Sequence, residues 1–219
     1  MTDIIFITDI HGKTDIASSI FEKEDPDYVL IGGDITDLGQ SLEKVIPLMA
    51  DIAAPTFAVP GNCDSRGIIS VIEASDAVSI HNKTIDIGDI TLTGIGGSNK
   101  TPFDTPFEYT EEEIDEMLSP LVSKMKKNRW NILVSHAPPY GALDEVALDV
   151  RVGSHSVAEY IKNFDIVCCG HIHEQKGIAE LEGRICVNPG MCKEGNYAVI
   201  TLEEDEDPKI VLKNINDEE

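Results

Sequence analysis

The chain has 219 residues, with 17 Lys and Arg against 40 Asp and Glu, which gives a formal net charge of −23 at pH 7. Its apolar content of 42% is ordinary for a globular protein, and no apolar run approaches the ~20 residues needed to cross a bilayer. Such an excess of acidic residues argues against tight binding to nucleic acid or an anionic membrane, because binding to either needs clustered Lys and Arg. We expect one domain over residues 1–219, with an acidic C-terminal segment from about residue 203.

Two features of the sequence favour a reduced, cytoplasmic protein. The first residues, MTDIIFITDI, contain neither a basic leader nor a small-residue cleavage site. The five cysteines are an odd number without a CxxC pair, which argues against both a disulfide framework and a zinc knuckle.

Short β-branched runs alternate with helical patterns over most of the chain. Each run is too short for a helix and stops at Gly, Pro or a polar residue, so these runs predict buried strands at 4–8, 28–31, 56–59, 132–134 and 166–169. Spaced apolar residues predict helices at 14–24, 42–51, 110–127 and 154–163. Pro47 indicates a kink or a helix start close to it.

The pattern changes to hairpins at 83–94 and 177–187 and to a last strand pair, 196–202 with 209–212. Strand–helix alternation combined with hairpins predicts a layered α/β fold with mixed sheets. The irregular stretch 98–108 has two Pro and two Phe in polar surroundings. It has two interpretations: a lid or self-association contact, or a loop that tucks its aromatic side chains onto the core.

Polar side chains follow each of the five predicted buried strands at its carboxyl end. In α/β sheets ligand sites assemble at that edge, so we expect these side chains to lie together. Each alone has an ordinary explanation as a cap, a turn or a satisfied loop histidine. In chain order the segments are Asp9-Ile10-His11, Gly32-Gly33-Asp34, Asn62-Cys63-Asp64, His136 and His171-Ile172-His173.

The types of these side chains predict a centre with two metal ions. Seven neutral or anionic ligands are too many for one tetrahedral zinc and suit two ions that share a carboxylate. A thiolate-free set of imidazoles and carboxylates favours Mn, Fe, Zn, Ni or Co over Mg or Ca, with Mn the expected ion. Two such ions can activate a bridging water and attract a phosphate ester locally. The candidate ligands are Asp9, His11, Asp34, Asn62, His136, His171 and His173.

The motifs Asp-x-His, Gly-Asp, Gly-Asn-x-Asp, a later His and Gly-His-x-His, in this order between residues 9 and 173, resemble the calcineurin-like metallophosphoesterase family. Residues 135–141, 169–174 and 188–190 further resemble its small prokaryotic phosphoesterases. The resemblance implies a four-layer α/β/β/α sandwich with two mixed sheets. It also implies hydrolysis by attack of a metal-bridging hydroxide, without a covalent enzyme intermediate.

The resemblance further implies a role for each site residue. One ion would be held by Asp9, His11 and His173, the other by Asn62, His136 and His171, and both by Asp34. Asp64 would orient its neighbours, and the residues expected to serve catalysis are Asn62, Asp64 and His136.

Cys63 departs from the family pattern, because many members have His at this position as a donor to the leaving group. A thiol is a weak donor and a poor general acid near neutrality, so we expect a small phosphodiester or related ester rather than a monoester with a poor leaving group. The competing interpretation of Cys63 is a small packing residue.

Substrate contacts are less well marked. Arg66 and Lys100 are candidates for pairing with a phosphate. His155 is expected to be exposed at the start of a helix, and Asp144 is expected to have a structural role.

The sequence therefore predicts a dinuclear metal-dependent phosphoesterase with a small phosphate-ester substrate. The alternative is a non-catalytic metal-binding scaffold on the same fold, against which the complete ligand set argues. A nuclease similar to the family's DNA-repair branch is disfavoured by the acidic surface. The hairpins and the Phe-bearing loop are compatible with a homodimer.

Overall fold

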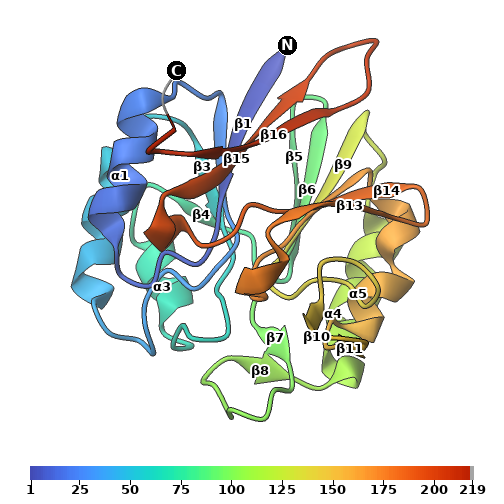
Figure 1. The fold of residues 1–219 in the computed structure, drawn as a ribbon. Helices are drawn as coiled ribbons and strands as arrows, with labels where there is room; N and C mark the ends of the chain where they lie inside the picture. The colour runs from blue at the N-terminus through green and yellow to red at the C-terminus, as the bar shows by residue number, and fades with distance from the viewer. Residues whose placement is uncertain (218–219) are drawn as a thin grey trace.

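The computed structural model describes residues 1–217 and contains two six-stranded sheets (Figure 1). The first sheet has the order β16-β15-β1-β2-β3-β4. Its strands β1, β2, β3 and β4 are parallel, and β15 and β16 extend it antiparallel beyond β1. The strands are β1 (Thr2–Ile7), β2 (Tyr28–Ile31), β3 (Thr56–Ala58), β4 (Val78–Ser79), β15 (Asn196–Leu202) and β16 (Lys209–Asn214).

The second sheet has the order β13-β14-β12-β9-β6-β5. Its four central strands are parallel, and β5 and β13 are antiparallel edges that belong to the two predicted hairpins. The strands are β5 (Lys83–Ile87), β6 (Ile90–Ile95), β9 (Trp130–Ser135), β12 (Ile166–Cys168), β13 (Gly177–Leu181) and β14 (Arg184–Asn188).

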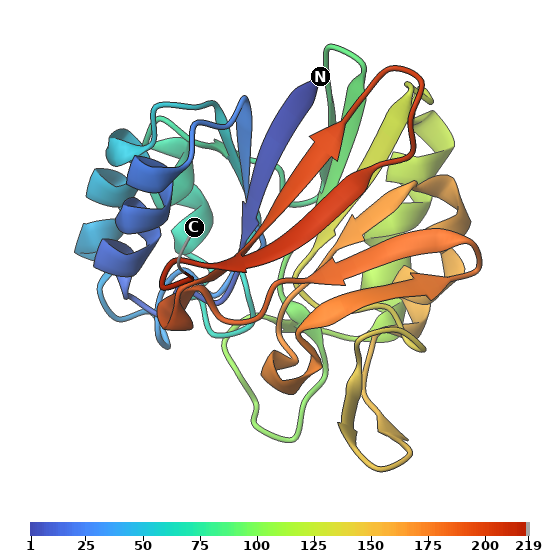
Figure 2. The same cartoon turned by 45° about the horizontal axis from the view of Figure 1, so that its top comes forward.

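Helices cover the outer face of each sheet, which confirms the predicted four-layer α/β/β/α sandwich (Figure 1, Figure 2). The side chains of β1 alternate between the two faces of the first sheet and show how the layers form. Ile4 and Phe6 face the second sheet, whereas Ile5 and Ile7 face the helices, and all four side chains are buried. The helices are α1 (Thr14–Lys23), α2 (Val45–Asp51) and α3 (Ile68–Glu73) on the first sheet, with α4 (Glu111–Lys124) and α5 (His155–Glu159) on the second.

The helix boundaries differ from the predicted ones for local reasons. A 3-10 turn at Leu42–Lys44 precedes α2, and Pro47 lies in the first turn, where its missing N–H is not needed. Thr110 and Glu113 form a capping box that starts α4. The predicted helix 154–163 is wrong as one element: it divides into α5 and a 3-10 turn at Ile161–Asn163.

Several short elements were absent from the sequence prediction. They are β4, α3 and two small sheets, one pairing β7 (Ser98–Asn99) with β8 (Glu108–Tyr109), the other pairing β10 (Glu145–Ala147) with β11 (Val150–Arg151). In the described part of the chain, none of the helices has the length and hydrophobicity that a bilayer crossing requires.

Candidate metal centre

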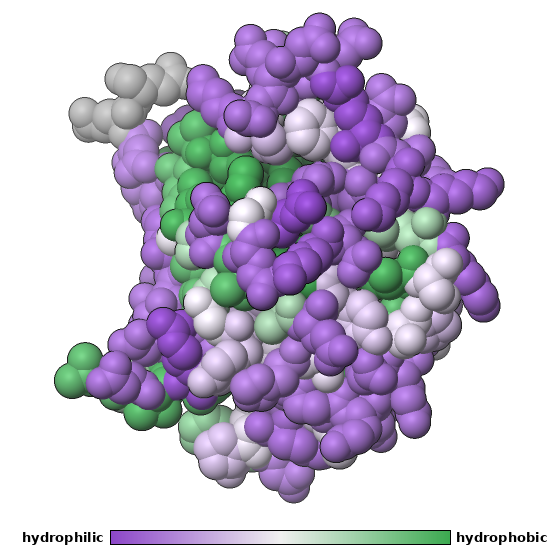
Figure 3. All heavy atoms as spheres, turned by 90° about the vertical axis from the view of Figure 1, so that its right-hand side faces the viewer, coloured by the Kyte–Doolittle hydropathy of each residue, from purple (hydrophilic) through white to green (hydrophobic). Residues whose placement is uncertain are grey.

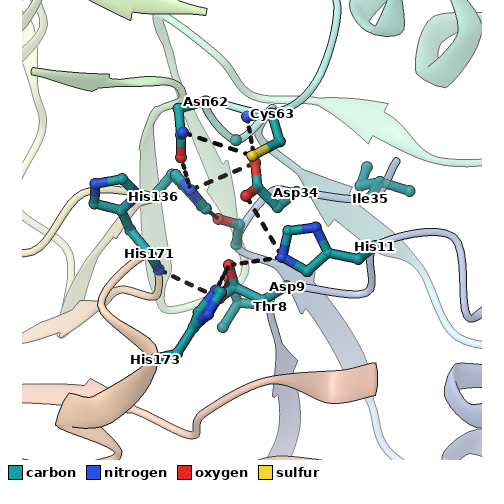
Figure 4. Close-up of polar contacts among 12 residues, drawn as sticks. Thr8, Asp9, His11, Asp34, Ile35, Asn62, Cys63, His136, His171 and His173 are labelled. Atoms are coloured by element: carbon teal, nitrogen blue, oxygen red, sulfur yellow. Dashed lines mark hydrogen bonds and ion pairs between the residues drawn. The ribbon is translucent and has the colours of Figure 1, made fainter. Parts of the chain in front are cut away.

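The seven predicted ligands converge at the carboxyl ends of β1, β2, β3, β9 and β12, where loops from both sheets meet (Figure 4). His173 Nε2 lies 3.2 Å from Asp9 Oδ1, and His11 Nε2 lies 3.8 Å from the same oxygen. The other carboxylate, Asp34, presents Oδ2 to His11 Nε2 at 3.7 Å and Oδ1 to His136 Nε2 at 3.6 Å. Asp34 therefore occupies the position between two groups of ligands that a bridging carboxylate requires.

The backbone at the centre is held in an unfavourable conformation. Asp9, His11, Asp34 and His171 have φ values of 57°, 46°, 48° and 66°, in the left-handed region that non-glycine residues seldom adopt. Each such residue costs on the order of 1–3 kcal/mol and persists only where its surroundings enforce it. Hydrogen bonds between the loops after β1 and β2 do so here, from Asp9 N to Gly33 O (3.0 Å) and from His11 N to Asp34 O (2.8 Å).

His11 provides a first test of whether these residues suit a cation. Its Nε2 is buried, lies between two carboxylates, and has no hydrogen-bond partner among residues 1–217. Burial lowers the pKa of His11 to about 4, so the ring is neutral near pH 7. An unpartnered imidazole nitrogen beside carboxylate oxygens fits a bound metal ion, which would compensate for its missing hydrogen bond.

The pair formed by His136 and Asn62 provides a second test. His136 Nδ1 lies 2.7 Å from the carbonyl oxygen of Gly32, which can only accept, so Nδ1 donates and Nε2 carries a lone pair in the neutral ring. That Nε2 is 2.9 Å from Asn62 Oδ1, which is also an acceptor. With the ring in its neutral form both atoms are acceptors, an arrangement that is unfavourable alone and favourable where the two atoms are ligands of one cation.

The orientation of the Asn62 amide follows from its other neighbours. Thr105 Oγ1 donates to the Glu108 carboxylate at 2.6 Å, so it accepts from Asn62 Nδ2 at 3.0 Å. Burial opposes ionisation of Glu108, but its hydrogen bonds with Thr101 and Thr105 lower its pKa to about 2, so it remains an acceptor. Asn62 Oδ1 must then be the atom that faces His136.

The protonation of the remaining ligands also suits metal ions. Burial raises the pKa of Asp34 to about 7, and the nearby charges of Asp9 and Asp64 act in the same direction. Burial opposes ionisation of Asp9 as well, but its hydrogen bond with His173 and the surrounding imidazoles lower its pKa. Burial lowers the pKa of His171 to about 3. The centre thus combines the neutral imidazoles of His11 and His171 with closely spaced carboxylates, whose mutual repulsion divalent cations would relieve.

Asp64 lies behind the ligands and connects two of their loops. Its carboxylate accepts hydrogen bonds from Gly61 N (2.8 Å), Ile35 N (3.1 Å), Thr36 N (2.8 Å) and Thr36 Oγ1 (2.7 Å). Because Ile35 and Thr36 follow Asp34 while Gly61 precedes Asn62, this buried carboxylate fixes the two loops relative to each other.

The Cys63 side chain faces the centre. Its sulfur belongs to a group with His11 and Asp34 in which the potential ligand atoms all lie within 4.8 Å of one another, and its N–H donates to Asp34 Oδ1 at 2.7 Å. Burial and the adjacent Asp34 carboxylate raise the pKa of the thiol, so it is neutral and a weak acid.

The basic residues predicted for substrate contact lie in different settings. The Arg66 guanidinium stacks over Phe107 at 4.7 Å and over Tyr109 at 5.1 Å, and it donates to the Glu108 carbonyl at 3.4 Å. Lys100 lines a cavity that also includes His171 and His173.

Three further residues lie outside the ligand set. The sequence reasoning missed Lys193. Burial is the main cause that lowers the pKa of His11, the Asp9 charge opposes it, and the Lys193 charge lowers the pKa further. The only sequence signal for Lys193 is its place three residues after the Asn188-Pro189-Gly190 motif. As expected, His155 is exposed at the start of α5, and Asp144 is buried and structural.

Comparison with known proteins shows the family of this chain and agrees with its fold. The chain belongs to the calcineurin-like phosphoesterase family, whose profile matches residues 2–175. It is 42% identical over 196 residues to protein MJ1162 of Methanocaldococcus jannaschii, covering 85% of this chain and 87% of that protein. The chain is thus a phosphoesterase of this family, with a candidate site for divalent metal.

Solved structures with similar folds share much less sequence. The protein TT1561 of Thermus thermophilus superimposes with a TM-score of 0.75 at 19% identity, covering 98% of this chain and 99% of that one. A dimetal phosphatase from Danio rerio gives a TM-score of 0.64 at 15% identity, covering 97% and 95% of the two chains. At these identities the likeness establishes the fold.

Proposed function

We propose that this protein is a dinuclear metal-dependent phosphodiesterase that hydrolyses a small phosphodiester or related ester. The observation that carries the proposal is the position of Asp34, whose two oxygens face His11 and His136 on opposite sides. The net charge of −23 favours a small substrate over nucleic acid.

The ligands divide into two sets around Asp34. Asp9, His11 and His173 would hold one ion and Asn62, His136 and His171 the other, with Mn²⁺ the ion we favour for both. Bound divalent ions supply Lewis acidity that polarises the phosphoryl group and lowers the pKa of water.

The chain's own residues fix the orientation of the ligands and determine which group could donate a proton. The Gly32 carbonyl fixes the ring of His136, and Asp64 holds the loops that carry Asp34 and Asn62. The neutral thiol of Cys63 cannot readily protonate a strongly basic alkoxide, because its own pKa is raised. Esters whose leaving group departs without protonation therefore suit this site better than alkyl monoesters.

The test is an assay of chelator-stripped protein on an aryl phosphodiester and the matching monoester, with and without Mn²⁺. We expect Mn²⁺ to restore turnover, with the diester cleaved faster, and Asp34→Asn to reduce it by at least about a hundredfold. Faster monoester cleavage would contradict the diester preference. Restored activity that persists in the Asp34→Asn variant would contradict the two-metal assignment, and absence of metal binding would favour the scaffold alternative.

A further inference from the structure

A cavity of about 460 Å³ borders the candidate metal centre, because His171 and His173 form part of its lining. One wall is the loop between β7 and β8, which contributes Pro102 and Phe103. The opposite wall is the β10–β11 hairpin and the residue that follows it, which contribute Val146 and Val152. This volume lies in the range of sites for small ligands.

Hydrogen bonds within the chain fix both walls of the cavity. Below the hairpin, the buried carboxylate of Asp144 accepts from Arg151 Nη1 at 2.6 Å and from the backbone N–H of Gly153 at 3.2 Å. Asn99 Nδ2 donates to the Val152 carbonyl at 3.1 Å and so joins one wall to the other. The chain's own contacts therefore hold the cavity in shape, which lowers the entropic cost of binding a ligand.

The lining of this cavity is mainly apolar. Most of its exposed surface is apolar and comes with Pro102, Phe103, Val146, Val152 and Ile172, beside the two imidazoles and the neutral polar side chains of Asn99 and Thr101. Its two charged members, Lys100 and Glu174, are exposed and of opposite sign, so they offer no cluster of cations for a second anionic group. Figure 3 shows the hairpin projecting at the lower left of the view with hydrophobic residues at its tip, where Leu148 is 86% exposed.

We propose that this cavity binds an uncharged apolar or aromatic group of the phosphate ester, so that the protein selects esters of hydrophobic alcohols over esters of sugars or polyanions. This inference rests on the proposed function, because it places the phosphoryl end of the substrate at His171 and His173. A phenyl ring that moves from water into such a lining gains on the order of tenfold in affinity.

The test compares two non-hydrolysable ligands of equal charge, phenylphosphonate and methylphosphonate, by calorimetric titration of the Mn²⁺-loaded protein. We expect phenylphosphonate to bind at least about tenfold more tightly. Val146→Ser should remove most of this preference without weakening methylphosphonate. Val150→Ser is the matched control, because Val146 and Val150 lie on the same hairpin with 46% and 47% exposure and only Val146 lines the cavity.

Equal affinities for the two phosphonates, no binding of phenylphosphonate, or equal losses in Val146→Ser and Val150→Ser would overturn the inference.

A parallel turnover assay separates this inference from the proposed function. It compares phenyl p-nitrophenyl phosphate with methyl p-nitrophenyl phosphate, which share one leaving group. Turnover of both with the same KM would overturn the apolar subsite and leave the phosphodiesterase standing. Absence of turnover with a retained phosphonate preference would overturn the phosphodiesterase and leave the subsite.

Discussion

Cys63 stands where the sequence analysis expects the family's histidine, and its surroundings define what it can do. The sulfur lies with His11 and Asp34, so the side chain faces the reaction site instead of the core. Burial and the Asp34 carboxylate raise the pKa of the thiol. Under the proposed function, a neutral thiol would donate a proton poorly, and this would limit the leaving groups that the site can release.

Replacement of Cys63 by His tests that limit. An imidazole at this position should protonate a departing alkoxide, so we expect C63H to raise the ratio of alkyl-ester to aryl-ester turnover by about tenfold or more, because only the alkyl leaving group needs a proton. Steady-state kinetics on a dialkyl and an alkyl aryl phosphodiester gives this ratio, and metal content measured in parallel serves as the control. An unchanged ratio with full metal content would show that residue 63 does not influence the leaving group.

Asp64 acts on structure through its four hydrogen bonds to backbone and hydroxyl donors. An asparagine side chain at this position offers one oxygen in place of two and turns an NH2 group toward donors. We therefore expect Asp64→Asn to lower the free energy of unfolding of the metal-free protein by about 2–4 kcal/mol. Urea unfolding measures the change, with the exposed Asp205→Asn as control. A loss equal to that of the control would contradict the positioning role.

At the scale of elements, the loop between β7 and β8 links the metal centre to the cavity. Thr105 on this loop orients the Asn62 amide, and Glu108 orients Thr105. The same loop carries Phe103 and Lys100 in the cavity wall. Its Phe107 is buried on the core, as one of the two interpretations of the sequence expected, whereas its Phe103 is 80% exposed.

Thr105 offers a matched pair of variants. Thr105→Val keeps the shape but loses the acceptor for Asn62 Nδ2, so the amide can rotate and its oxygen is no longer directed at His136. We expect this change to weaken binding of one of the two ions by about 10–100-fold, while Thr105→Ser retains it. Calorimetric titration with Mn²⁺ measures both. Equal affinities in the Val and Ser variants would contradict the orienting role.

The elements that sequence reasoning found and those that it missed differ in how they are stabilised. The strands before Asp9, Asp34 and His136 are buried on both faces, so their apolar runs are visible in the sequence. The β10–β11 hairpin is short and exposed, and it is held by Asp144 and Arg151, a contact that hydrophobic periodicity does not report. Lys193 was missed for a similar reason, because only the folded chain brings it near His11.

For the whole molecule, the metal centre lies where the two sheets meet. Asp9, Asp34 and Asn62 follow strands of the first sheet, whereas His136 and His171 follow strands of the second. Neither sheet alone carries the full set of ligands. Bound ions would therefore connect the two halves of the sandwich and stabilise their packing as well as serve the reaction.

The measurement that tests this account most directly is the number of divalent ions bound per chain, determined by calorimetric titration of chelator-stripped protein with Mn²⁺. We expect two ions for the native sequence and for the control His155→Ala, whose histidine is exposed and stacks on Tyr140. We expect Asp34→Asn to weaken the binding of both ions, because each set of ligands uses this carboxylate. One ion per chain, or two ions of unchanged affinity in Asp34→Asn, would contradict the shared centre.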